Sequence, residues 1–268
     1  MSRFYSLTSC FSTTAFQVHC ADTDFKIKEY LQDYKCFMGI NHFPEIELKT
    51  KEVSPSLADN QGYDSAATTY YDVATDKHTL IVSTNLQLSK YLVFHELTHI
   101  WDTEMYADKD KVKYAGLSGF TEYHASQIEL MILLGASTFT SELSFSMNNE
   151  IETFAGTKTV QEYVAMKYKH AVNLFSRQDF PADIAMLKTA LGVWYNYMGL
   201  RSVCEKYATD YTSCEDSNWV MMKYMSTQLF TMTNTLMHGW LEKSVISEMS
   251  IPLYINTIMP IINTYYLT

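Results

Sequence analysis

Cysteine is scarce in this chain, and its spacing argues against a scaffold held by disulfides. The 268 residues include five cysteines with no C-x-x-C pair among them, at Cys10, Cys20, Cys36, Cys204 and Cys214. An odd number at wide spacing is typical of reduced thiols in a cytoplasmic protein. We therefore expect a cytoplasmic location. Secretion without a classical signal stays open, and Cys204 and Cys214 could pair in an exported protein.

The chain also has few basic residues and few long apolar runs. Lys and Arg number 20 against 30 Asp and Glu, a net charge of -10, and no basic run occurs. This balance argues against binding to nucleic acid or to anionic membranes. The first residues lack the apolar core of a signal peptide. The most apolar stretch, Ile251 to Leu267, is broken by two prolines and two asparagines, so we expect a buried terminal helix and no membrane span.

Apolar residues make up 47% of the chain, which is ample for a sizeable core. The length suits one domain with two lobes, or two small domains. We predict a catalytic lobe over residues 1–135 and a mostly helical lobe over residues 136–268 that closes the cleft. The chain has no internal repeat and no low-complexity segment, and the oligomeric state stays open.

The most informative motif is His95-Glu96-Leu97-Thr98-His99, an H-E-x-x-H pattern. On a helix, positions i and i+4 lie on one face, so both imidazoles can point into one tetrahedral metal site. Glu96 stands beside the first histidine, where a carboxylate can reach a metal-bound water. This arrangement is typical of a zinc hydrolase, usually a metallopeptidase.

The residues around the motif favour a helix that packs on a sheet. Thr79 to Ser83 is β-branched and apolar, as expected of a strand. Thr84 to Gln87 matches an S/T-x-x-Q capping box, which predicts the start of a helix. The helical pattern runs on to Asp102 without glycine or proline. The alternative is a buried helix with two hydrogen-bonded histidines.

A catalytic zinc site needs a third protein ligand, and the next helix can supply it. The segment from Ser118 to Gly135 is predicted as a well-buried helix, in which a carboxylate needs a reason to be present. Glu122 is our first candidate for this ligand. Three alternatives stay open, namely His124, Glu129 and Asp102. His124 lies about 200° around the helix from Glu122, while Glu129 shares its face and could orient a ligand instead.

His95-Glu96-x-x-His99 followed by a helix with Glu122 resembles the gluzincin group of zinc metallopeptidases. The Glu122-x-x-Ala125 start is also similar to the small bacterial and phage-borne peptidases of the ImmA/IrrE type. The resemblance implies an α+β, zincin-like fold with a small twisted N-terminal sheet behind the active-site helix. It implies Zn²⁺ as cofactor and a peptide or protein as substrate. Ser126 departs from the pattern, since many gluzincins carry an Asp there that orients a zinc histidine.

The implied reaction uses a zinc-activated water, with Glu96 as the general base. The oxyanion needs a further donor, for which His124 and Tyr123 are the preferred candidates, ahead of Tyr106 and Tyr114. His170 and His238 sit in helical patterns that favour a structural role.

The expected order of elements in the first lobe is a strand, a helix, three strands and the His95 helix. The strands are expected at 14–20, 45–49, 68–73 and 80–82, with a helix from Asp24, a turn at 75–77, a polar loop at 54–65 and a charged link at 107–113. One strand of the hairpin is our candidate to hold an extended substrate. The second lobe is expected to have a connection or an irregular hairpin at 137–149. Helices are expected to follow at 159–175, 181–207, 219–243 and 251–267, with caps at Thr159 and Ser217.

Two other functions remain possible. The chain could be a zincin-fold regulator that binds zinc without peptidase activity, although such a protein has no need of Glu96. It could also be a helical interaction protein without metal, which leaves His95, Glu96, His99 and Glu122 unexplained together.

Overall fold

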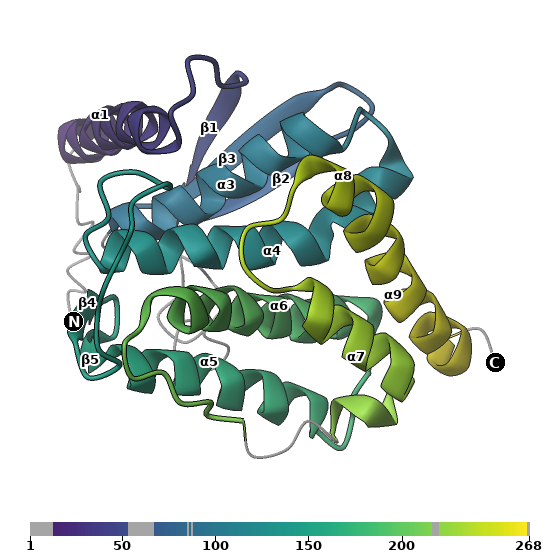
Figure 1. Ribbon diagram of the computed structural model, residues 1–268. Helices are drawn as coiled ribbons and strands as arrows, with labels where there is room; N and C mark the ends of the chain where they lie inside the picture. Colours follow the sequence, from purple (N-terminus) through teal and green to yellow (C-terminus); the bar gives the residue numbers. More distant parts are fainter. Residues whose placement is uncertain (1–12, 53–66, 85, 87, 216–219, 267–268) are drawn as a thin grey trace, which may run out of the picture.

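A small sheet and a series of helices form successive layers in the computed structural model (Figure 1). The structure describes residues 13–52, 67–84, 86, 88–215 and 220–266. The sheet lies against α3 (Lys90–Tyr106), which packs on α4 (Lys111–Leu133). Below α4 follow α6 (Ile184–Tyr207) and α5 (Val160–Phe175). The fold is therefore mixed α and β, as predicted.

The sheet has three strands in the order β1-β3-β2. β1 (Ile46–Lys51) runs parallel to β3 (Lys77–Ser83), and β2 (Ala67–Asp72) pairs antiparallel with β3. These strands and the turn between β2 and β3 confirm the predicted elements. The predicted loop at 54–65 lies outside the described residues. Leu80 and Val82 of β3 are fully buried, as expected of a central strand.

The predicted strand at residues 14–20 is wrong, because α1 (Thr13–Met38) is already helical there. Local β-propensity is a weak signal that helix continuity can override. The later part of α1 packs on α3 through aromatic rings. The Tyr34 and Phe37 rings lie 5.2 Å and 5.7 Å from that of Phe94, measured between centroids. The α1 helix thereby fixes the position of the helix with the H-E-x-x-H motif.

The predicted starts of α3 and α4 are also wrong. Helix α3 begins after Ser89 and not at the Thr84 capping box. The amide of Thr84 donates a hydrogen bond to the Lys51 carbonyl oxygen, so Thr84 still extends the pairing of β3 with β1. Helix α4 begins after Asp110, whose carboxylate accepts the amides of Val112 and Lys113. The expected charged link therefore shrinks to residues 107–110.

The second half of the chain begins with a hairpin, β4 (Glu150–Thr153) and β5 (Gly156–Thr159), which was not predicted. The capping box at the start of α5 is confirmed, with Thr159 and Glu162 bonding each other's backbone amides. Helix α6 begins after Asp183, slightly later than predicted.

The predicted continuous helix over 219–243 is wrong. The chain instead forms a short turn, η1 (Met221–Lys223), and then α7 (Thr227–Leu236), which Ser226 caps. Gly239 has a φ of +66°, a left-handed conformation that glycine adopts without strain, and the chain turns here. The predicted cap at Ser217 lies outside the described residues.

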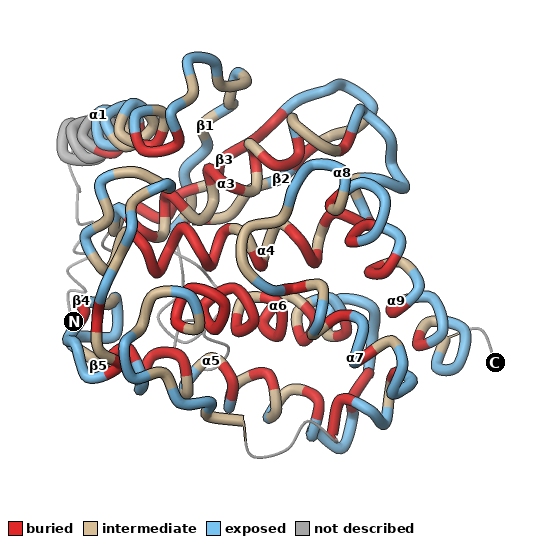
Figure 2. Tube along the Cα trace, in the orientation of Figure 1, coloured by how far each residue is buried: buried red, intermediate tan, exposed pale blue. Residues whose placement is uncertain are grey.

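The last helical segment joins α8 (Lys243–Val245), one π-helical turn, η2 (Ile246–Ser250), and α9 (Ile251–Tyr266). A helix forms here as predicted, but it is buried only in part, at Ile251, Leu253, Tyr254, Thr257 and Ile261. Contrary to expectation, Lys243–Tyr266 is long and apolar enough to cross a membrane by length and composition, and no other helix in the described ranges is. One face of α9 packs on α4, and the other face is exposed (Figure 2).

Among the long helices of the described residues, α4 and α6 are the most deeply buried (Figure 2). They cross closely because Gly199 of α6 lies against the backbone of α4. A Cβ at this glycine would stand 2.1 Å from the carbonyl oxygen of Tyr123. Among the described cysteines Cys36, Cys204 and Cys214 no disulfide forms, so Cys204 and Cys214 are not paired.

Candidate metal centre

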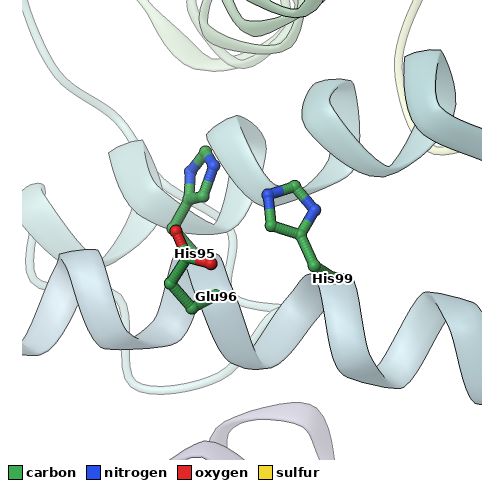
Figure 3. A group of neighbouring side chains, drawn as sticks. All are labelled: His95, Glu96 and His99. Carbon is green, nitrogen blue, oxygen red and sulfur yellow. The ribbon is translucent and has the colours of Figure 1, made fainter. Parts of the chain in front are cut away.

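Helix α3 carries His95 and His99 one turn apart on the side that faces α4. Both imidazoles project from the same side of the helix, and the Glu96 carboxylate lies beside them (Figure 3). The two rings are 4.8 Å apart between centroids and nearly perpendicular. One nitrogen of each histidine and a carboxylate oxygen of Glu96 can lie within 4.8 Å of one another. The opposite side of α3 is anchored by buried apolar residues such as Phe94 and Leu97.

A carboxylate from α4 faces both histidines. The Oε2 atom of Glu122 lies 3.5 Å from His95 Nε2 and 3.8 Å from His99 Nε2. In a tetrahedral zinc site with ordinary bond lengths, two ligand atoms are roughly 3.4 Å apart. These two separations therefore fit a shared ion after small side-chain adjustments. The side chain of Glu122 is 29% exposed, and that of His95 is 12% exposed, so the cluster opens on one side.

The second nitrogen of each imidazole is held by a hydrogen bond. His95 Nδ1 lies 2.9 Å from Glu129 Oε2, and His99 Nδ1 lies 2.9 Å from Thr121 Oγ1. A buried carboxylate accepts hydrogen bonds, so it favours the tautomer of His95 with its proton on Nδ1. That tautomer leaves the Nε2 lone pair for a metal, an arrangement common around zinc histidines.

Two side chains fix Glu129 in turn. The hydroxyl of Tyr163 donates a short hydrogen bond to Glu129 Oε1, and Lys167 Nζ lies 3.7 Å from the same oxygen. Burial would raise the pKa of Glu129, but Lys167, His95 and Tyr163 lower it to about 2. Glu129 therefore stays ionised and orients His95, although it does not lie on the Nε2 side of the ring.

Glu122 is held from α6. Asn196 hydrogen-bonds its carboxylate, and Ser126 donates to Asn196 Oδ1 over 2.7 Å. Ser126 thus supports Glu122 through Asn196, while Glu129 orients His95. Burial would raise the pKa of Glu122, but the charges and hydrogen bond of the two histidines lower it to about 2.

The two histidines differ in protonation when no metal is present. Burial would lower the pKa of His95, but hydrogen bonds to Glu122 and Glu129 outweigh it and raise the pKa to about 10. Burial lowers the pKa of His99 to about 4, although Glu122 opposes this shift. Without metal, His95 therefore carries a second proton, and a bound cation would replace the proton on Nε2.

Glu96 belongs to a different environment from Glu122. Its Oε2 accepts the hydroxyl of Thr69 over 3.1 Å, and the backbone of Thr69 also bonds the carboxylate. Burial raises the pKa of Glu96 to about 7, against the attraction of His95. A carboxyl that ionises near neutral pH can take up and release a proton, which suits a general base.

A cavity of about 840 Å³ lies over the cluster. Its walls come from strand β2 and from helices α3, α4, α5 and α6, so both halves of the chain contribute to it. His95, His99, Glu122 and Glu96 all line it. The volume is ample for several residues of a peptide.

No family model matches this chain. Comparisons with curated proteins and with solved structures also found no match.

Two of the candidate catalytic residues do not line the cavity. The hydroxyl of Tyr123 donates to the Gly239 carbonyl oxygen over 2.6 Å, and Tyr123 is fully buried. His124 Nδ1 lies 2.9 Å from Asp102, and its ring stacks on Phe120. The physical reason is helical rotation, since residues one or two positions after Glu122 point away from its face. Neither side chain is in position to donate to a reacting carbonyl, which corrects the sequence-based assignment.

The Asp102–His124 pair supports His99 from behind. Thr121 bonds both His99 Nδ1 and the Asp102 carboxylate, so it links the pair to the metal-facing ring. This placement also separates Asp102 and His124, the alternative third ligands, from the Nε2 atoms. Of the other oxyanion candidates, Tyr114 lines the cavity and Tyr106 does not.

Several neighbours of the site carried no recognisable signal in the sequence. They are Thr69, Thr121, Tyr163, Lys167 and Asn196. Lys167 lies far in sequence from any motif, and Thr121, although it directly precedes Glu122, owes its role to the packing of α4 on α3. His170 also lines the cavity, whereas His238 is an exposed side chain 2.9 Å from Glu205.

Proposed function

We propose that this protein is a zinc-dependent metallopeptidase, with His95, His99 and Glu122 as the zinc ligands. The observation that supports it most is that one oxygen of Glu122 faces the Nε2 atoms of both histidines at the edge of a wide cavity. Structural zinc sites are closed by four protein ligands, whereas catalytic sites keep one position open. Three converging ligands on an open cavity therefore favour catalysis over the alternative of a zinc-binding regulator.

When bound, zinc lowers the pKa of a water and polarises the scissile carbonyl. Glu96 is the residue placed to accept the proton of that water. The Thr69 hydroxyl and backbone hold its carboxylate, so its position does not depend on the ion. Glu96 would later pass the proton to the leaving amine. Glu129 and Thr121 keep the two imidazoles in the orientation that the ion requires.

We also propose that the fold is zincin-like. A small sheet lies behind the helix of the H-E-x-x-H motif, as the resemblance to gluzincins implies. Strand β2 is an edge of this sheet within the described residues, and Thr68 to Tyr71 line the cavity. The backbone of Thr69 bonds Glu96, and that of Tyr71 bonds the Tyr114 hydroxyl, so the outer edge of β2 faces the site. An extended peptide could pair with this edge through main-chain hydrogen bonds.

The first experiment measures the zinc content of the purified protein by mass spectrometry. We expect about one zinc per chain, lost in both His95→Ala and Glu122→Ala, because three ligands are needed for tight binding. His238→Ala is the control, since His238 is exposed and its partner is Glu205, which is not part of the cluster. Zinc that persists in Glu122→Ala would move the third ligand to another residue. A chain that binds no added zinc would refute the proposal.

Catalysis is tested separately with Glu96→Gln. This variant keeps the shape of the side chain but cannot accept a proton, so we expect zinc to remain while peptide cleavage falls by at least about a hundredfold. A degenerate peptide library is the right substrate, because a peptidase with one natural target is inactive on a single generic protein. Unchanged cleavage in Glu96→Gln would exclude it as the base.

A further inference from the structure

The cavity wall opposite β2 carries basic side chains in an otherwise acidic protein. Lys167 of α5 and Lys188 of α6 both line the cavity, while the chain as a whole has a net charge of -10. The lining carboxylates are those of the metal cluster, Glu96, Glu122 and Glu129. The remaining charged surface of the cavity is therefore positive on this side.

The spacing along α6 places Lys188 next to the metal cluster. Lys188, Gly192 and Asn196 follow one another at i+4 intervals, so they lie on one face of the helix, and all three line the cavity. A Cβ at Gly192 would lie 3.4 Å from Glu122 Oε1, and Asn196 hydrogen-bonds the same carboxylate. Lys188 is therefore about 6 Å farther along the helix axis from the point where α6 touches Glu122.

Lys188 is available to a ligand. Its residue is exposed, and no ion pair joins its ammonium group to a carboxylate in the part of the chain that the structure describes. Lys167, in contrast, is anchored 3.7 Å from Glu129 and lies over the ring of Tyr163 at 5.6 Å from its centroid. Lys167 thus adds a fixed positive charge behind the site, and Lys188 can reach into the cavity.

Resting on the peptidase function proposed above, we propose that Lys188 forms a subsite for a carboxylate of the peptide substrate, with Lys167 adding to its positive field. An extended peptide advances about 3.3 Å per residue, so this carboxylate would lie one or two residues from the scissile bond. It can be an acidic side chain or the C-terminal carboxylate of a short peptide. Either group would make a charge-assisted hydrogen bond to the lysine ammonium.

Peptide binding to zinc-loaded Glu96→Gln protein tests this subsite without turnover. Three hexapeptide pools carry an uncharged fluorophore at the N-terminus and are degenerate in neutral residues. The first pool has one central Asp or Glu and an amidated C-terminus, the second is neutral with a free C-terminus, and the third is neutral and amidated. Fluorescence anisotropy gives the dissociation constant of each pool, and the first two pools distinguish the two sources of the carboxylate.

We expect one of the first two pools to bind about tenfold more tightly than the third, as one charge-assisted hydrogen bond would provide. Lys188→Met should abolish this preference and Lys188→Arg should keep it. Lys169→Met is the matched control, because Lys169 is exposed on α5 and does not line the cavity. Equal binding of all pools, or a preference that survives Lys188→Met, would overturn the proposal.

The outcome separates this subsite from the peptidase function. The same three pools are also tested with Glu96→Gln protein from which a chelator has removed any metal, so that this result does not depend on zinc binding. A carboxylate preference that depends on Lys188, found in a chain that binds no added zinc, would support the subsite and remove only the peptidase function. Zinc binding and cleavage without any carboxylate preference would remove only the subsite.

Discussion

Replacing Gly199 by alanine tests how closely helix α6 must approach α4. The added Cβ would lie 2.1 Å from the Tyr123 carbonyl oxygen and 3.0 Å from the Ser126 Cβ. The first atom belongs to the backbone of a buried helix, so one helix must move. Such overpacking costs about 1–3 kcal/mol, and more where the backbone shifts. Alanine in a helix interior recovers up to about 1 kcal/mol relative to glycine. We therefore expect a net loss of about 2 kcal/mol.

Gly192→Ala is the matched control on the same helix. Its Cβ would meet the Glu122 side chain at 3.4 Å or more, which is ordinary van der Waals contact. The gain in helix propensity should leave this variant as stable as the parent, or up to about 1 kcal/mol more stable. The two variants should thus differ by about 2–3 kcal/mol despite the same chemical change.

Thermal unfolding monitored by circular dichroism measures this difference. In a chain of this size, 1 kcal/mol shifts Tm by about 2–4 °C, so Gly199→Ala should melt about 4–8 °C below the parent. Displacement of α6 in Gly199→Ala should also weaken zinc binding, because Asn196 holds Glu122 from the same helix. Equal melting temperatures of the two variants would refute the close crossing of α4 and α6.

Three further predictions follow from the contacts of the site and its frame. Glu129→Gln should lower zinc affinity by about 10–100-fold, measured by competition with a chelator, because His95 loses its charged partner; the exposed Glu152→Gln should have no effect. Zinc binding at pH 8 should release about one proton, since the pKa of His95 is about 10 without metal and its ring must be neutral to bind; affinity should fall as the pH is lowered. Calorimetry in buffers of different ionisation enthalpy gives this proton count, and a value near zero would contradict the protonation of His95. Thr159→Ala should lower the free energy of unfolding by about 1 kcal/mol in urea, because it removes the cap of α5, whereas Thr157→Ala should change it little.

The elements predicted best are those whose signal is local. The capping box of Thr159 and Glu162 starts α5 where the sequence predicts, because both partners lie within one turn. The similar pattern at Thr84 does not start a helix, since Thr84 is held by Lys51 at the end of the sheet, a contact remote in sequence. The segment at 14–20 shows the same limit, because its local preference for a strand gives way to a long helix.

The site follows the same division. Helical periodicity suffices to bring His95, His99 and Glu122 together once α3 and α4 are placed side by side. The sequence leaves open whether Glu129 is a ligand or orients one. Only the packing of α4 on α3 places it beside His95 Nδ1, where it orients the ring. Tyr123 and His124 lie near Glu122 in sequence but face Gly239 and Asp102, so proximity along the chain was misleading. Lys188 and Asn196 come from the other half of the chain and had no local signal.

The short link between α3 and α4 restricts where this chain can gain or lose residues during evolution. Every proposed zinc ligand lies within these two helices, and only residues 107–110 separate them. One residue inserted between His99 and the end of α3, or between the start of α4 and Glu122, would add about 100° of helical rotation between the ligands and the turn that joins the two helices. The histidines and Glu122 would then no longer face each other while both helices keep their packing. Asp108 and Lys109 have left-handed φ values of 50° and 56° and form the turn, so length changes are best tolerated there. Relatives that differ in length between the motif and Glu122 should therefore vary at this turn and keep both helical registers.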